Sequence, residues 1–269
     1  MRLCDILLIL ALIGTTIGIW HLSPFERQFI ISDPTINHPF AEHERVTVAQ
    51  LFIYAVVVPL VIIIIFGLIC SDPRHRFYIT YLSAVGLIVS CIVTSVTTDI
   101  LKNYIGRQRP DFIARCQPKL DANTTVWVYA KDVCTQTDMN KLKDGFRSTP
   151  SGHSLISFAG LFYLTLFLSG QFLIWDQIVG AWRTVLAAIP TLGALFIAIS
   201  RTEDYRHHFV DVCIGGVIGI LIACWSYYRV FPPVSSGVAH VPRIILAEQL
   251  QLEKRADDVR DGLYQSLEV

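Results

Sequence analysis

Long apolar runs constrain the fold of this chain more than any other feature of its sequence. A helix needs roughly 20 apolar residues to cross a bilayer core about 30 Å thick. Six runs come close to this length: residues 3–20, 48–69, 78–99, 153–174, 182–200 and 209–228. They are continuously apolar and lack the alternation of barrel strands. Because lipid offers no partners to backbone N–H and C=O groups, the sequence predicts an all-α integral membrane bundle of six transmembrane helices.

The composition fits a membrane protein, since 53% of the 269 residues are hydrophobic and only 16% are charged, against about 25% in a typical soluble domain. No clear small-residue cleavage site precedes Trp20, which favours a signal anchor over a cleaved signal peptide. We expect one membrane domain over residues 1–233 and a cytosolic polar tail over residues 234–269. Within the tail, residues 243–260 form a short amphipathic helix or remain disordered.

Three short polar blocks border these apolar runs. They are Lys102 with Arg109-Pro110, then Pro150-Ser151-Gly152-His153, then Ser200-Arg201 with His207 and Asp211. In a six-span protein, the loops after the third and fifth spans lie on the same side of the membrane, as does the segment 21–47. The blocks should therefore meet at one membrane face. There they offer two histidines, a carboxylate and three fixed cations, which together can bind a phosphate and displace it.

The third block holds a candidate nucleophile. If a helix begins at His207, then Asp211, four residues on, lies on the same helix face and reaches the imidazole. A carboxylate on one ring nitrogen fixes the tautomer and leaves the other nitrogen free to attack. We expect the adjacent His208 to point elsewhere. The alternative for this block alone is a His–Asp pair that caps a helix at the interface.

The second block has the pattern of a phosphate-binding helix start. Thr149 is a candidate N-cap and Pro150 suits the first turn, so free backbone N–H groups would face a phosphate. Gly152 lets an oxyanion approach the backbone. His153 projects at the same level, where it can donate a proton to a leaving oxygen. Taken alone, the block equally fits an ordinary capped helix start.

The first block supplies cations at the end of the third span. Lys102 and Arg109 are seven residues apart, about two turns, and would share one face of a helix that ends at Pro110. Arg binds phosphate bidentately and Lys as a point charge, although the pair by itself also fits snorkelling interfacial cations. The combination of the three blocks favours a phosphate site. The residues alone do not decide which histidine is the nucleophile and which is the acid.

Loop features favour an extracytosolic, lumenal position for the blocks. Asn123 begins an Asn-Thr-Thr glycosylation sequon, and Cys116 and Cys134 flank it and can form a disulfide in an oxidising compartment. The count of Lys and Arg residues in the loops does not decide the orientation. The net charge is zero, so we expect no nucleic-acid partner.

The blocks resemble the signature of the type 2 phosphatidic acid phosphatase superfamily: Lys-x6-Arg-Pro, Pro-Ser-Gly-His and Ser-Arg-x5-His-x3-Asp, in the same order and spacing. Supporting stretches in and around the signature resemble the fungal diacylglycerol pyrophosphate phosphatases within this superfamily; they include residues 24–29, 36–39, 106–112 and 130–134. The similarity extends from about residue 24 to Pro233 and leaves the tail uncovered.

The resemblance implies a division of labour in the site. His207 attacks phosphorus to form a phosphohistidine, Asp211 orients His207, and His153 protonates the leaving oxygen. The phosphoryl oxygens are held by the remaining signature residues, Lys102, Arg109, Ser151, Gly152 and Arg201. No metal or other cofactor is expected, because the cations are already present and no acidic cluster suits Mg²⁺.

The implied activity is that of a metal-independent lipid phosphate phosphatase. It converts diacylglycerol pyrophosphate to phosphatidate and phosphatidate to diacylglycerol, and it also acts on lysophosphatidate. Alternatives are a sphingoid-base phosphate or polyprenyl diphosphate phosphatase, or a non-catalytic protein that binds or transports lipid phosphates. A membrane phospholipid is the expected partner, and the oligomeric state is left open. A fungal origin would favour the vacuolar membrane; otherwise the Golgi, the endoplasmic reticulum or the plasma membrane is expected.

Overall fold

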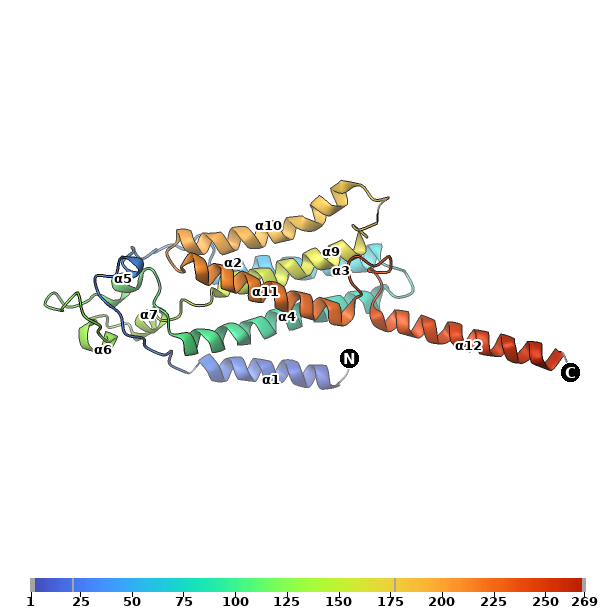
Figure 1. Ribbon diagram of the computed structural model, residues 1–269, viewed down its shortest axis with the longest axis horizontal. Coiled ribbons are helices and arrows are strands. Elements are labelled where there is room, and N and C mark those ends of the chain that lie inside the picture. The colour runs from blue at the N-terminus through green and yellow to red at the C-terminus, as the bar shows by residue number, and fades with distance from the viewer. Residues whose placement is uncertain (1–2, 21, 177, 268–269) are drawn as a thin grey trace.

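The computed structural model describes residues 3–20, 22–176 and 178–267, which form a bundle of long helices (Figure 1). The bundle consists of α1 (Leu3–Trp20), α2 (Val48–Phe52), the π-helical turn η2 (Ile53–Val57), α3 (Val58–Cys70), α4 (Arg76–Ile105), α8 (Gly152–Ser157), the π-helical turn η3 (Phe158–Phe162), α9 (Tyr163–Gln171), α10 (Ala181–Glu203) and α11 (Phe209–Val230). The other elements are η1 (Pro34–Ile36), α5 (Phe112–Cys116), α6 (Ala130–Val133), α7 (Met139–Asp144) and α12 (Arg243–Leu267). The described residues contain no β-strand, only isolated bridges between Phe29 and Val128 and between Pro118 and Cys134.

Five helical stretches of the described chain are long and apolar enough to cross a membrane: Val48–Cys70, Arg76–Ile105, Gly152–Gln171, Ala181–Glu203 and Phe209–Val230. They match five of the predicted runs and confirm an all-α membrane fold. The predicted first span is the helix α1, which runs beside α4 (Figure 1); its crossing of the membrane stays a prediction. Residues 1–2 and 268–269, at the ends of the predicted domain and tail, lie outside the described residues.

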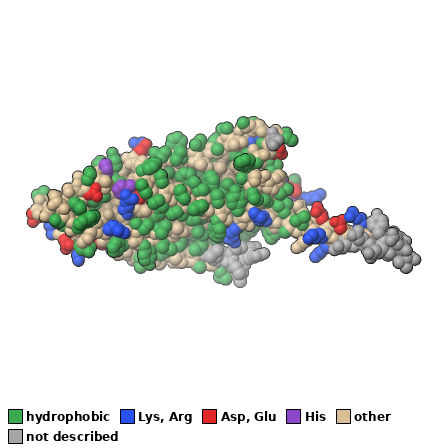
Figure 2. Space-filling view, in the orientation of Figure 1, with side chains coloured by type: hydrophobic (Ala, Val, Ile, Leu, Met, Phe, Trp, Pro, Cys, Tyr) green, Lys and Arg blue, Asp and Glu red, His purple; other side chains and the backbone are tan. Residues whose placement is uncertain are grey.

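Small residues let the central helices approach closely. A Cβ on Gly160 in η3 would collide with the carbonyl oxygen of Ala55 in η2, and one on Gly219 in α11 would lie 2.5 Å from the carbonyl oxygen of Leu155 in α8. Close approach at small residues is a usual means of helix packing in lipid. The outward side chains form a broad apolar band, and histidines gather at one end of it (Figure 2).

The connections 22–47 and 106–151 fold into a cap over that end of the bundle. The core of the cap is aromatic: the ring centroid of Phe112 lies 4.8 Å from that of Phe29 and 4.7 Å from that of Phe146. Cys116 and Cys134 are joined by a disulfide, with their Cα atoms 4.7 Å apart. The cap therefore holds loop residues of the polar blocks against the helix ends.

The polar tail follows the opposite end of the bundle. Its helix α12 spans Arg243–Leu267 and extends well beyond the other helices (Figure 1). Of the two alternatives for residues 243–260, the structure therefore has the helix, and the helix is longer than predicted.

Candidate active site

A helix end splits the first block. α4 ends at Ile105, and Gly106 adopts the left-handed conformation with φ 60°, where a side chain would also collide with the carbonyl of Phe25. Lys102 therefore lies in the last turn of α4, whereas Arg109 lies in the cap. The prediction that Lys102 and Arg109 share one helix face was wrong because the helix ends at Gly106, well before Pro110.

Arg109 is buried and held by the cap. Its Nε donates to the backbone carbonyl of Asp144 at 2.8 Å, its Nη2 to the carboxylate of Asp144 at 2.8 Å, and its Nη1 to the backbone carbonyl of Arg206 at 3.2 Å. Burial opposes ionisation of Asp144, but Arg109 and then Arg115 outweigh it and hold the pKa of this carboxyl group below its ordinary range. Arg109 is thus a fixed cation that joins the first block to the third.

The second block begins its helix later than predicted. Ser151, not Thr149, is the N-cap of α8, and its Oγ accepts from the backbone N–H of Ser154 at 3.5 Å. The hydroxyl of Thr149 instead donates to the carboxylate of Asp211 at 2.5 Å, so the predicted N-cap was wrong. Gly152 opens the helix, and a Cβ there would lie 3.1 Å from Nζ of Lys102. An anion at this helix start would touch both the free N–H groups and the ammonium group.

His153 follows in the first turn of α8. Its Nε2 lies 3.1 Å from the backbone carbonyl oxygen of Val46, in the segment before α2. Because a carbonyl oxygen can only accept a hydrogen bond, this nitrogen carries the proton. His153 therefore presents an N–H group at Nε2.

His207 lies outside the helix that was expected to contain it. α11 begins at Phe209 with His208 as its N-cap, so His207 and Asp211 do not share a helix face. The carboxylate of Asp211 accepts from the backbone N–H of His208 at 3.1 Å and lies 3.2 Å from its Nδ1. Among the described residues, no hydrogen bond joins Asp211 directly to His207. The predictions of a direct pair, and of His208 pointing elsewhere, were wrong because the helix starts two residues later.

Asp211 is a fully buried junction between the second and third blocks. Its carboxylate accepts from the hydroxyl of Ser148 at 2.6 Å, from the hydroxyl of Thr149 and from Nη1 of Arg107 at 2.9 Å. The backbone carbonyl of Ser148 in turn accepts from Nδ1 of His207 at 2.6 Å. Asp211 therefore acts on His207 indirectly: it holds Ser148, whose backbone carbonyl orients the imidazole of His207.

His207 is only 3% exposed, and its surroundings keep it neutral. Burial, followed by the positive charges of Arg109 and Lys102, lowers the pKa of the imidazole well below its usual value of 6.5. The ring proton lies on Nδ1, which donates to the carbonyl of Ser148, so Nε2 carries a lone pair. The two histidines thus differ at Nε2: His207 has a lone pair there and His153 has an N–H group.

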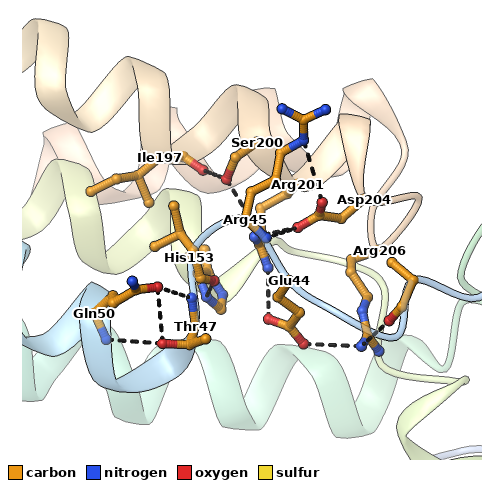
Figure 3. Close-up of polar contacts among 12 residues, drawn as sticks. Glu44, Arg45, Thr47, Gln50, His153, Ile197, Ser200, Arg201, Asp204 and Arg206 are labelled. Carbon is orange, nitrogen blue, oxygen red and sulfur yellow. Dashed lines mark hydrogen bonds and ion pairs between the residues drawn. The ribbon is translucent and has the colours of Figure 1, made fainter.

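Arg201, in the last turn of α10, is buried against two carboxylates (Figure 3). Its Nη1 donates to Glu44 at 2.9 Å, its Nη2 to Asp204 at 2.6 Å, and its Nε to the hydroxyl of Ser200 at 3.2 Å. Glu44 belongs to the segment 21–47, which was predicted to lie on the same side as the blocks. The structure therefore brings all three blocks and this segment together.

Several residues that build the site were not singled out in the sequence. They are Glu44, Arg107, Asp144, Ser148, Arg206 and His208. Four of them flank the signature residues closely, which is a usable signal. Glu44 and Asp144 come from connections that give no local signal. In the part of the chain that the structure describes, no group of three or more His, Cys, Asp or Glu side chains is arranged to hold a metal ion.

The long apolar helices define an integral membrane protein, and at one end of its bundle two histidines lie among buried arginines that are paired with carboxylates. Residues 83–234 match the family model of the PAP2 superfamily, and the chain belongs to this family. The matched range contains all three polar blocks, which confirms the resemblance to the type 2 phosphatidic acid phosphatases.

Named relatives point in the same direction. The chain is 47% identical to diacylglycerol pyrophosphate phosphatase 1 of Saccharomyces cerevisiae, an alignment that covers 90% of this chain and 83% of that protein. It is 38% identical to the probable diacylglycerol pyrophosphate phosphatase 1 of Schizosaccharomyces pombe, with 89% and 83% covered. It is 36% identical to the probable lipid phosphate phosphatase 4 of Arabidopsis thaliana, with 86% and 73% covered.

Proposed function

We propose that this chain is a membrane lipid phosphate phosphatase that acts on diacylglycerol pyrophosphate, phosphatidate and lysophosphatidate. One observation carries the proposal: His207 presents a lone pair and His153 an N–H group at Nε2, and the two imidazoles lie close enough to interact electrostatically. A phosphatase that forms a covalent intermediate needs both groups, one to attack phosphorus and one to protonate the leaving oxygen. The names of the three relatives support a lipid phosphate as the substrate.

The reaction would proceed in two steps. First, Nε2 of His207 forms a bond to phosphorus while the P–O bond to the leaving group breaks. His153, protonated on both ring nitrogens when the anionic substrate is bound, gives its Nε2 proton to the leaving oxygen and becomes neutral. A water molecule then attacks the phosphohistidine, His153 takes up a proton of that water, and the P–N bond breaks to release inorganic phosphate. In both steps Asp211 positions His207 through Ser148.

The protein itself supplies the charge that stabilises the transferring phosphoryl group. We assign this role to Lys102, Arg109 and Arg201, together with the backbone N–H of Gly152 at the start of α8. The N–H of Ser151 already donates to the backbone carbonyl of Asp211 at 3.0 Å, so Ser151 contributes as the helix cap. The proposed mechanism routes no step through a metal or another cofactor.

We place the site on the extracytosolic side of the membrane. The disulfide Cys116–Cys134 supports this orientation, because it lies in the cap beside the site and disulfides persist in oxidising compartments. The exposed Asn123 is a candidate glycosylation site in the same connection. A fungal origin of the chain would favour the vacuolar membrane, with the Golgi, the endoplasmic reticulum and the plasma membrane as the other candidates.

Phosphate release by purified protein in detergent and EDTA tests the function. The substrates are diacylglycerol pyrophosphate, phosphatidate, lysophosphatidate, a sphingoid-base phosphate and a polyprenyl diphosphate. We expect release from the three glycerolipids at the same rate with and without EDTA. Activity that is lost in EDTA and restored by Mg²⁺ would contradict the metal-independent mechanism. Hydrolysis confined to the last two lipids would reassign the substrate, and lipid binding without any turnover would favour a transport or binding protein.

A further inference from the structure

The segment 41–47 lies directly against the third block and His153 (Figure 3). The carbonyl of Ala41 accepts from Nη2 of Arg206 at 3.3 Å, and the carbonyl of Val46 lies 3.1 Å from Nε2 of His153. The backbone N–H of Arg45 donates to the carboxylate of Asp204 at 3.0 Å. This segment therefore covers the same groups that a substrate phosphate would have to reach.

Glu44 places a carboxylate between two buried guanidinium groups. Its Oε2 accepts from Nη1 of Arg201 at 2.9 Å, and its Oε1 lies 3.0 Å from Nη2 of Arg206. The side chain of Glu44 is 26% exposed, whereas those of Arg201 and Arg206 are 1% and 10% exposed. An anion with two oxygens thus already bridges the arginines from the solvent side, which is the geometry that a phosphate would adopt there.

Arg206 depends on this carboxylate more than Arg201 does. Asp204 also holds Arg201, at 2.6 Å, so Arg201 keeps a close partner when Glu44 is absent. Among the described residues, the other carboxylate in reach of Arg206 is Asp111 at 3.9 Å, and the buried Nε of Arg206 has no hydrogen-bond partner there. Removal of Glu44 would therefore leave Arg206 as a buried cation short of anions.

Further positive charge surrounds Arg206. Its guanidinium lies 4.6 Å from the ring centroid of Phe40, and the same ring is approached by Arg115 at 4.9 Å and by Lys141 at 4.1 Å. Arg115 is already paired with Asp111 and Asp144, so the positive charge available to an anion here comes mainly from Arg206 and Lys141. Arg206 also directly precedes His207, and its carbonyl accepts from Arg109, so it belongs to the framework of the site.

We propose that Arg206 is a further phosphate-binding residue and that the carboxylate of Glu44 occupies its anion site until a phosphate displaces it. The proposal rests on the proposed function, since the displacing group is the phosphate of the substrate or the inorganic phosphate product. Displacement has a second consequence. Val46 lies two residues after Glu44, so movement of this segment releases the Nε2–H group of His153 for the leaving oxygen. Phosphate binding and the release of the acid are thereby coupled.

Inorganic phosphate is the probe for the experiment. The inhibition constant for phosphate is measured during lipid hydrolysis, and phosphate affinity is measured separately from the shift in thermal unfolding, which needs no turnover. E44Q keeps the size of the side chain and removes its charge, so we expect phosphate to bind about tenfold more tightly. R206Q should bind phosphate about tenfold more weakly. E42Q is the matched control, because Glu42 is an exposed carboxylate of the same segment; it should bind as the parent does.

Two outcomes overturn the proposal. If E44Q weakens phosphate binding as R206Q does, Glu44 only braces the arginines. If phosphate does not raise the hydrogen exchange of the amides of residues 44–47 in the parent protein, phosphate does not displace the segment. Failure of the proposed function looks different: the parent protein would not hydrolyse lipid phosphates, whereas the thermal-shift affinities would still follow the charge of Glu44 and Arg206.

Discussion

The two histidines of the site are held by different parts of the molecule. His207 donates to the carbonyl of Ser148, and Ser148 is bonded to the fully buried Asp211, so the cap and α11 fix this imidazole together. In the described chain, the ring of His153 has one hydrogen bond, to the carbonyl of Val46 in the segment that carries Glu44. One histidine is thus held by the cap and α11, and the other by the segment that we propose a phosphate displaces.

This difference matches two different chemical tasks. A nucleophile must be oriented before the substrate arrives, because a small misplacement can cost about 100-fold in rate. An acid must instead deliver its proton when negative charge develops on the leaving oxygen. The framework around His207 suits the first task. The replaceable partner of His153 suits the second.

The largest expected effect is on the hydrolysis rate, and its dependence on the leaving group should differ between His207 and His153 variants. His207→Ala removes the proposed nucleophile, so hydrolysis of both phosphatidate and diacylglycerol pyrophosphate should fall about 10⁴-fold or more. His153→Ala removes the proposed acid, so phosphatidate, whose leaving group is an alkoxide, should be hydrolysed about 10²- to 10⁴-fold more slowly. Diacylglycerol pyrophosphate should suffer less, because its leaving phosphate oxygen is weakly basic. Initial rates of phosphate release measure all four values.

Similar losses of activity in the two variants would contradict the assignment of different roles to His207 and His153. Equal losses on both lipids for His153→Ala would show that His153 does not protonate the leaving oxygen. Turnover that persists in His207→Ala would show that His207 is not the nucleophile. Thermal unfolding of each variant in detergent shows whether the fold is intact.

An intermediate effect concerns the indirect link from Asp211 to His207. Asp211→Asn removes the charge that holds Ser148, so we expect kcat to fall about 10²-fold with little change in KM. Ser148→Ala keeps the carbonyl that contacts His207 and loses the hydroxyl, so kcat should fall less, about tenfold. Thr149→Ser keeps the neighbouring hydroxyl on Asp211 and serves as the control. A larger loss in Ser148→Ala than in Asp211→Asn would contradict the order of this chain of contacts.

Much of the fold follows from the sequence because its determinants are local. A continuous apolar run is sufficient to specify a spanning helix, and five runs lie where expected. The prediction that the polar blocks meet required only that the loops after the third and fifth spans lie on the same side of the membrane. The polar connections carry no such periodic signal, so the cap with its aromatic core around Phe112 was not predicted.

Details of the site depended on single residues at helix ends. A start at Phe209 rather than His207 turns Asp211 towards His208, and an end at Gly106 separates Arg109 from Lys102. Helix boundaries are the least certain part of a sequence-based prediction. Glu44 and Asp144 reach the site from distant connections, and a pairing of charges across the fold leaves no trace in the local sequence.

The smallest expected effect tests the neutral state of His207 through stability. The pKa of His207 is well below 6.5 in the folded protein, mainly because of burial, and near 6.5 in the unfolded chain. Just below pH 6.5 the unfolded chain therefore binds more protons, so stability falls as the pH falls, by up to about 1.4 kcal/mol per pH unit from this group. Above this range the contribution is complete.

Thermal unfolding midpoints between pH 5 and 7.5 should thus fall less steeply with decreasing pH in His207→Ala than in the parent. His43→Ala, which removes an exposed histidine, is the control. Parallel curves for His207→Ala and the parent would show that the fold does not hold His207 neutral.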